Sequence, residues 1–236
     1  MRRSLAGPTI LAGVLGVAGC GGSQAPSAPT PLPSPSGLPP AATARYSVTF
    51  EATWNAASHP TDIPPNPHFS ALIGGTHRAG VSFWEAGGQA SEGVRQMAER
   101  GRQSPLDAEV NAAIAAGQAQ HLLAGADVPS SPGTTSLEFA VSLEYPLVTL
   151  VTMVAPSPDW FVGVSGLSLF ENGSWVEERS VELYPWDAGT DSGSTYRSPD
   201  QATTPPEPIQ RLTGAPVAVS GVVPPMGRFV FRRLGP

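Results

Sequence analysis

Two strand-like segments separated by a hairpin turn, inside residues 156–193, constrain the fold of this chain most strongly. Residues 161–170 and 176–184 are rich in Val, Leu and aromatic side chains, a composition typical of β-strands. Between them, the sequence Glu-Asn-Gly-Ser at residues 171–174 predicts a tight turn. Because a hairpin brings the outer ends of its strands together, the loops on either side of this segment are expected to meet at one end of a sheet.

Both of these loops carry carboxylates. Asp159 precedes the first strand, and Asp187 and Asp191 follow the second. Three carboxylates in one place repel each other unless a cation lies between them, and Ca²⁺ is the hard, oxygen-liganded cation that fits most simply. Gly189 and Gly193 allow the second loop to bend. The alternative is that each Asp caps a turn through its own backbone.

The rest of the chain is also dominated by strands. Residues 46–54 alternate strictly between large apolar and polar side chains, which indicates a half-buried strand. Residues 147–155 are almost entirely apolar, which indicates a central strand covered on both faces. Further strands are expected at residues 69–73, 81–84, 136–144, 217–223 and 228–234. Together these segments predict an all-β fold, an antiparallel sandwich of about eight strands.

Two helices are expected beside the strands. Residues 92–100 carry apolar side chains on one face, with Ser91 predicted as the N-cap and Gly101 as the residue that ends the helix. A second, alanine-rich helix is predicted from Leu106 or Asp107 to Leu123. Its side chains are small, so both helices are interpreted as accessory elements that pack against the sandwich.

The charge of the chain excludes one class of function. The formal net charge is −6, and the sequence contains no basic run. Nucleic-acid binding requires positive charge to neutralise phosphates, so no nucleic-acid partner is expected. The single cysteine, Cys20, cannot form a disulfide within the chain.

The N-terminal segment has the pattern of a bacterial lipoprotein signal. Arg2 and Arg3 precede an apolar stretch that ends in Val-Ala-Gly-Cys, which places Cys20 as the lipidated residue. We therefore predict a signal peptide at residues 1–19, and the lipidated Cys with a Pro-, Ser- and Gly-rich linker at residues 20–44. The folded domain is then expected at residues 45–236, outside the cytoplasm and anchored to a bacterial cell or outer membrane. The alternative is an ordinary secreted protein with an inert cysteine.

Several motifs, taken in order, resemble the spondin N-terminal domain family. The two longest are PSPDWFVGV at residues 156–164 and YPWDAGTDSG at residues 184–193. Shorter ones precede and follow them, namely Trp54, His59-Pro60, FSALIG at residues 69–74, His77, SFW at residues 82–84, AERG at residues 98–101 and Pro224-Pro225. The resemblance covers nearly all of the expected folded domain.

This resemblance implies a C2-like β-sandwich in which loops at one end hold calcium. The calcium positions of the family fall on Asp159 and Asp187, and Asp191 follows. Glu138 resembles a further acidic ligand, although its alignment requires a one-residue gap. The pattern is not that of an EF-hand.

Histidines do not provide a competing metal site. His59, His68, His77 and His121 fit no zinc spacing, and no cysteine assists them. Structural or surface roles are therefore expected, and His77 is interpreted as a residue that packs in a loop.

These observations predict a non-catalytic, calcium-binding module for binding or adhesion at the cell envelope. Its ligand, whether protein, glycan or lipid, is not specified by the sequence. One alternative is a calcium-dependent carbohydrate-active enzyme that uses Asp159 and Asp187 as paired acids, with Trp160 and Trp186 stacking on sugar. Another is a sandwich in which calcium is purely structural.

Overall fold

The computed structural model describes residues 41–236. The predicted signal peptide, Cys20 and the linker up to residue 40 lie outside the described residues. The first strand, β1, spans Thr43–Ala52, so the folded domain begins two residues before the predicted boundary at residue 45. No helix in the described part of the chain is long and apolar enough to cross a membrane.

The alternating segment at the start of the domain becomes a central strand of the first sheet. This sheet has the order β10 (Glu178–Leu183), β13 (Gly227–Gly235), β1 and β5 (Gly133–Ser142), and its neighbouring strands are antiparallel. Tyr46, Val48 and Phe50 all face inward and are fully buried, which confirms the predicted alternation. Phe50 lies opposite Phe229 in the register between β1 and β13.

The second sheet is built around the apolar strand that the sequence placed at its centre. This strand, β6 (Leu147–Ala155), is buried along almost its whole length. The sheet order is β12 (Gln210–Arg211), β11 (Trp186–Asp187), β7 (Trp160–Ser168), β6, β3 (Ile73–His77) and β4 (Ala119–Ala124), and β2 (His68–Phe69) also pairs with β6.

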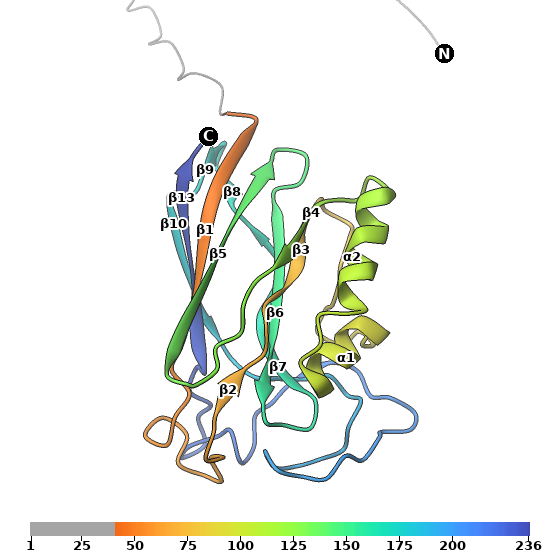
Figure 1. The fold of residues 1–236 in the computed structure, drawn as a ribbon, viewed down its shortest axis with the longest axis vertical. Coiled ribbons are helices and arrows are strands. Elements are labelled where there is room, and N and C mark those ends of the chain that lie inside the picture. The colour runs from red at the N-terminus through yellow and green to blue at the C-terminus, as the bar shows by residue number, and fades with distance from the viewer. Residues whose placement is uncertain (1–40) are drawn as a thin grey trace, which may run out of the picture. The chain divides into compact units, whose positions relative to one another are not determined.

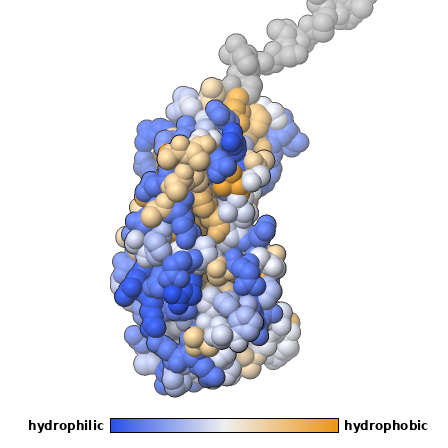
Figure 2. Space-filling model, turned by 90° about the vertical axis from the view of Figure 1, so that its right-hand side faces the viewer, coloured by the Kyte–Doolittle hydropathy of each residue, from blue (hydrophilic) through white to orange (hydrophobic). Residues whose placement is uncertain are grey.

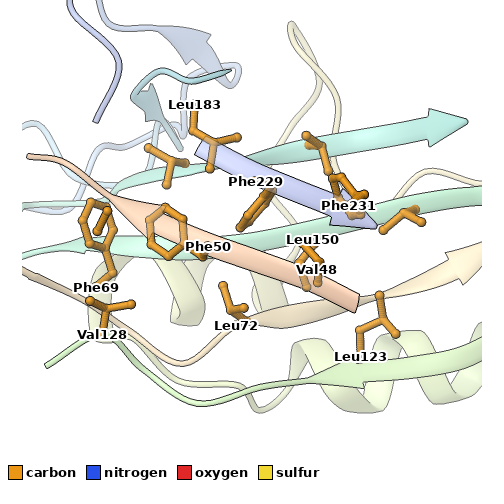
Figure 3. Packing of buried hydrophobic residues seen from close by; sticks show 14 of the residues in the cluster. Val48, Phe50, Phe69, Leu72, Leu123, Val128, Leu150, Leu183, Phe229 and Phe231 are labelled. Atoms are coloured by element: carbon orange, nitrogen blue, oxygen red, sulfur yellow. The ribbon is translucent and has the colours of Figure 1, made fainter. Parts of the chain in front are cut away.

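The two sheets face each other and enclose the main hydrophobic core, which confirms the predicted antiparallel sandwich (Figure 1). Phe50 contributes to the centre of this core, with edge-to-face contacts to Phe69 and Phe229 at centroid distances of 4.9 and 5.4 Å. Leu150 of β6 points into the same core from the second sheet (Figure 3). Burial of aromatic side chains at such contacts supplies much of the stability of a sandwich.

The helices α1 (Glu92–Arg100) and α2 (Leu106–Ala115) cover the outer face of the second sheet, where a second hydrophobic cluster lies (Figure 1). The bounds of α1 are those predicted. The Ser91 side chain accepts a hydrogen bond from the Val94 N–H at 3.2 Å, and Gly101 ends the helix with φ of 63°.

The second helix is shorter than predicted. It ends at Ala115, and residues 119–124 form β4, which pairs with β3. Gly117, with φ of 65°, marks the break. Alanine favours a helix locally, but the free edge of β3 offers a row of backbone partners, and this tertiary pairing prevails.

Three other short predictions were wrong. A strand was expected at residues 69–73, but only its two ends lie in strands, Phe69 in β2 and Ile73 in β3. β3 continues through Gly74, where a Cβ would approach the Thr149 carbonyl oxygen to 2.0 Å. Only glycine permits this close packing of two backbones. Residues 81–84 form a loop, and residues 217–223 contain only an isolated bridge between Val219 and Val222.

The predicted hairpin between residues 161 and 184 was wrong in its pairing, although its turn is present. Asn172 and Gly173 both have positive φ, and they connect β8 (Phe170–Glu171) to β9 (Ser174–Trp175). The longer strands on either side do not pair with each other. β7 belongs to the second sheet and β10 to the first, so the chain crosses between the sheets here.

Figure 2 shows the face of the molecule that carries the helices. Its hydrophobic surface gathers in the upper half, whereas its lower part is mostly hydrophilic. The late loops, including the one with Asp187 and Asp191, lie at this lower end in Figure 1. This end of the sandwich therefore offers a polar surface.

Candidate functional site

The two acidic loops meet through β11 rather than through a hairpin. Trp186 and Asp187 form this short strand, which pairs with Phe161 and Trp160 at the start of β7. The Ala188 N–H also donates to the Asp159 carbonyl oxygen at 3.2 Å. The juxtaposition expected from the sequence is therefore present, but a long-range strand pairing produces it.

The Asp159 side chain is fully buried and only half satisfied. Its Oδ2 accepts hydrogen bonds from the Thr190 N–H at 2.7 Å, the Asp191 N–H at 3.0 Å and the Thr190 hydroxyl at 3.2 Å. Its Oδ1 is buried without a hydrogen-bond partner among the described residues. Burial, together with the nearby charge of Asp187, raises the pKa of Asp159 to about 7 despite these hydrogen bonds.

Asp187 is half-buried beside it. Its Oδ1 accepts a hydrogen bond from the Gly189 N–H at 2.7 Å. Burial raises the pKa of Asp187, and the negative charges of Glu207 and Asp191 add to this effect. The sequence did not single out Glu207, because it lies in a proline-rich loop far along the chain with no motif around it.

The Asp191 side chain stabilises its own loop through hydrogen bonds to backbone N–H groups. Its Oδ1 accepts from the Gly193 N–H and its Oδ2 from the Gln201 N–H, both at 2.8 Å. This is the turn-capping role that was the alternative interpretation of the loop acids. Each carboxylate oxygen retains a second lone pair, so capping leaves Asp191 able to bind a further group.

A small polar cavity of about 270 Å³ lies beside these acids, lined by Asp187, Asp191, Glu207 and neighbouring loop residues. Gly189 gives the cavity its shape. It has φ of 75°, and a Cβ there would lie 2.0 Å from the Glu207 carbonyl oxygen. Only glycine lets the two loop backbones approach this closely.

The carboxylates of the two acidic loops provide some, but not all, of the oxygen ligands that a hard cation requires. Within residues 41–236, no three His, Cys, Asp or Glu side chains converge closely enough to hold a metal ion. Ca²⁺, however, takes six to eight oxygens, and backbone carbonyls and water supply many of them. The unpartnered Oδ1 of buried Asp159, close to the charge of Asp187, is an oxygen for which a bound cation is the natural partner.

The fourth candidate ligand lies elsewhere. Glu138 faces solvent from β5 in the first sheet, opposite Ser47, and accepts a hydrogen bond from Arg45 at 2.8 Å. The structure therefore does not bring Glu138 to the acidic loops. Cys20, the predicted lipidation site, lies outside the described residues.

His77 was expected to pack in a loop but is buried in β3. Its Nε2 lies 2.8 Å from the Thr149 hydroxyl, and burial lowers its pKa. His59 is also buried with a lowered pKa, with its Nδ1 beside the Ser58 hydroxyl at 3.0 Å. Both histidines therefore have structural surroundings.

Comparisons with known proteins agree with the motifs. The family model described as Spondin_N matches residues 44–219. "Spondin-2" from Homo sapiens is 40% identical over 178 residues, which is 74% of this chain and 54% of that protein. "Spondin-1" from Rattus norvegicus is 42% identical over 182 residues, which is 72% of this chain and 22% of that protein. The chain thus spans about half the length of the first relative and less of the second.

Proposed function

This chain belongs to the spondin N-terminal domain family, and from this membership we propose that it is a non-catalytic module for binding or adhesion that works outside the cytoplasm. The rigid sandwich positions polar loops at one end, and loops held in this way are common sites of binding. The proposal extends to a cation bound in those loops and to a lipid that anchors the chain.

The cation proposed is Ca²⁺, held by Asp159 and Asp187 with Asp191 in support. One observation carries this proposal, namely the buried Oδ1 of Asp159, which has no hydrogen-bond partner within the described residues. A buried carboxylate oxygen is costly unless it gains a proton or a positive partner. A divalent cation between Asp159 and Asp187 supplies such a partner and removes the repulsion between them.

Calcium in this position joins the loop before β7 to the loop after β11. The adjacent cavity, lined also by Glu207, leaves room for water or for a ligand oxygen to complete the coordination. A partner that offers a carboxylate could bind there through the open positions of the ion.

We test calcium binding by thermal unfolding of the full chain carrying Cys20→Ser, in Ca²⁺ and in EDTA. Calcium at about 100 times its Kd stabilises by about 2.7 kcal/mol, which raises the Tm by about 5–10 °C for a domain of this size. We expect Asp187→Asn to lose most of this rise. Glu138→Gln, which removes an exposed carboxylate far from the loops, serves as the matched control. An unchanged Tm in Ca²⁺, or an equal loss in Glu138→Gln, would contradict the proposal.

The burial of Asp159 favours a binding module over the carbohydrate-active enzyme. A paired-acid mechanism requires both carboxyl groups to reach the scissile bond. Asp159 is 0% exposed, and three donors occupy its Oδ2. Incubation with polysaccharides and analysis of the products distinguishes the two functions, because the enzyme alone releases shorter sugars.

We also propose that a lipid on Cys20 holds the module at the cell envelope. The order of basic residues, apolar stretch and Val-Ala-Gly-Cys supports this assignment. We expect Cys20→Ser to move the protein from the membrane fraction to the soluble fraction on centrifugation of cell extracts. Retention of the variant in the membrane fraction would argue for a different attachment.

A further inference from the structure

Two unpaired strand edges face a groove on one flank of the sandwich. β10 is the last strand of the first sheet, and within residues 41–236 it pairs only with β13. β11 pairs with β7 only at Trp160 and Phe161. In the described part of the chain no strand continues this pairing along the rest of β7, so its outer edge has no strand partner from Val162 onward. At the far end of this edge, the Arg179 guanidinium donates to the Ser168 carbonyl oxygen at 3.0 Å.

The groove between these edges has a volume of about 600 Å³. Residues 163–168 line one wall without a gap, so the backbone of β7 itself borders the space. Arg179, Val181 and Glu182 of β10 line the other wall. These six residues span about 20 Å, which is the length of a short extended peptide, although only the part before Gly166 is regular strand.

Aromatic side chains close one end of this β7–β10 groove. Trp84, Tyr184 and Trp186 line it there, and the rings of Trp84 and Trp186 meet edge to face at 5.2 Å. Arg211 of β12 lies over two of these rings, with its guanidinium carbon 4.5 Å from the centre of Tyr184 and 5.0 Å from that of Trp186. Stacking on aromatic rings fixes the plane of a guanidinium.

Arg211 differs from most arginines of the described chain because no carboxylate pairs with it there. Arg179, at the other end of the groove, is paired with Glu171 at 2.7 Å. A planar, stacked and unpaired guanidinium is suited to bind a carboxylate through two parallel hydrogen bonds. Glu85 and Glu182 also line the groove, and Glu182 accepts a hydrogen bond from the Tyr184 hydroxyl at 2.8 Å. Neither forms an ion pair with Arg211 among the described residues, so the positive charge at the aromatic end remains available to an acidic group of a ligand.

We propose that the β7–β10 groove docks an extended peptide of a partner protein, whose backbone pairs with the free edge of β7 and whose acidic side chain binds Arg211. Strand addition to an open sheet edge is a common mode of peptide recognition, in which backbone hydrogen bonds give affinity and side-chain pockets give specificity. Trp, Tyr and Arg are also the residues that dominate binding energy at protein interfaces. This site is separate from the calcium pocket.

The shape of the groove also determines which part of the peptide gives sequence specificity. The register of β6 and β7 shifts between Val148 and Leu150, and Gly166 on β7 has φ of 61°. This irregularity bends the edge, so regular pairing is short and ends near Ser165. Specificity then depends on the aromatic end, where an acidic side chain next to an apolar one satisfies both Arg211 and the rings.

The experiment is a selection from a phage-displayed library of random linear dodecapeptides on the full chain carrying Cys20→Ser. We expect the selected peptides to share an acidic residue beside apolar ones. Synthetic copies should bind Arg211→Ala about ten-fold or more weakly than the parent, because a charge-assisted bidentate contact is lost. Arg211→Lys should also weaken binding, since lysine keeps the charge but not the planar fork. Arg102→Ala, which removes another exposed arginine without a carboxylate partner in the described chain, should bind as the parent does.

Four outcomes would overturn the proposal. The first is that no peptide is enriched over uncoated wells, and the second is that peptides bind the Arg211→Ala variant as tightly as the parent. The third is that no peptide binds, while a glycan on an array binds the parent but not Arg211→Ala. The fourth is that sedimentation shows a dimer that depends on Arg211. The last two would assign the groove to a sugar or to a second copy of this chain. The peptide measurement is repeated with Asp187→Asn, so that failure of the calcium site is told apart from failure of the groove.

Discussion

Asp159→Asn is expected to lower the Tm relative to the parent chain in Ca²⁺ and to raise it in EDTA at pH 8. In calcium the substitution removes a ligand and with it the stabilisation that binding supplies. In EDTA it removes a buried charge that has no partner for Oδ1 within residues 41–236 and that lies near Asp187. The order of stability of the two proteins therefore depends on the cation.

The expected gain in EDTA follows from the raised pKa of Asp159, which burial brings to about 7. At pH 8 the folded protein must hold this group ionised in an unfavourable place, whereas the unfolded chain hydrates it. One pKa unit corresponds to about 1.4 kcal/mol, and a neutral amide oxygen accepts weaker hydrogen bonds than the carboxylate oxygen that it replaces, so we expect Asn to stabilise the cation-free protein by about 1–2 kcal/mol. Urea unfolding in EDTA and in Ca²⁺ measures both values.

Asp159→Ala separates the loss of charge from the loss of hydrogen bonds. Asparagine keeps an oxygen that can accept from the Thr190 and Asp191 N–H groups, whereas alanine leaves these donors without their partner. We therefore expect Ala to destabilise the protein by about 1–3 kcal/mol in EDTA, and by more in calcium, where the ligand is lost as well. If Asn destabilised the protein equally in both conditions, the role of Asp159 would be limited to hydrogen bonding.

Phe50→Ala is expected to cause the largest loss of stability, about 3–5 kcal/mol. Phe50 is fully buried between the sheets and contacts Phe69 and Phe229, so truncation leaves a cavity that the rigid strands fill poorly. The free energy of unfolding is measured by urea titration at constant calcium. Leu234→Ala, at a position 49% exposed, is the control and should change stability by less than about 0.5 kcal/mol. A loss below about 1 kcal/mol at Phe50 would contradict the packing described.

Much of the fold follows from local sequence patterns. The alternation around Phe50 fixes which face of β1 is buried, and the apolar run of β6 fixes its central place. Ser91 and Gly101 define α1, because N-cap and C-cap chemistry acts within a few residues. These features were predicted from the sequence because the residues that determine each of them lie within one short segment.

The remaining features depend on partners that are distant in the sequence. Residues 119–124 prefer a helix locally but pair with the free edge of β3. The strand expected to end at residue 73 instead continues through Gly74, because Thr149 of β6 approaches this position closely. No local pattern predicts the strand pairing that joins Asp187 to Trp160. Nor does one predict the approach of Glu207 to the acidic loops, because Glu207 is 48 residues beyond Asp159. Motifs suggested which acids matter, but only the tertiary structure shows that Asp159 is buried and half satisfied.

The path of β1 places the start of the domain and the acidic loops at opposite ends of the sandwich. The chain enters the sandwich at Ala41, whose carbonyl oxygen accepts from the Trp175 indole N–H at 2.7 Å. Eleven residues later β1 ends at Ala52, close to Trp54. Trp54 contacts Tyr196, which in turn contacts Trp160 beside Asp159. A ten-residue strand is about 33 Å long, so the point of entry and the carboxylates occupy opposite poles. A label or support joined to the domain ahead of Ala41 therefore attaches at the pole opposite the carboxylates and leaves that end of the sandwich accessible.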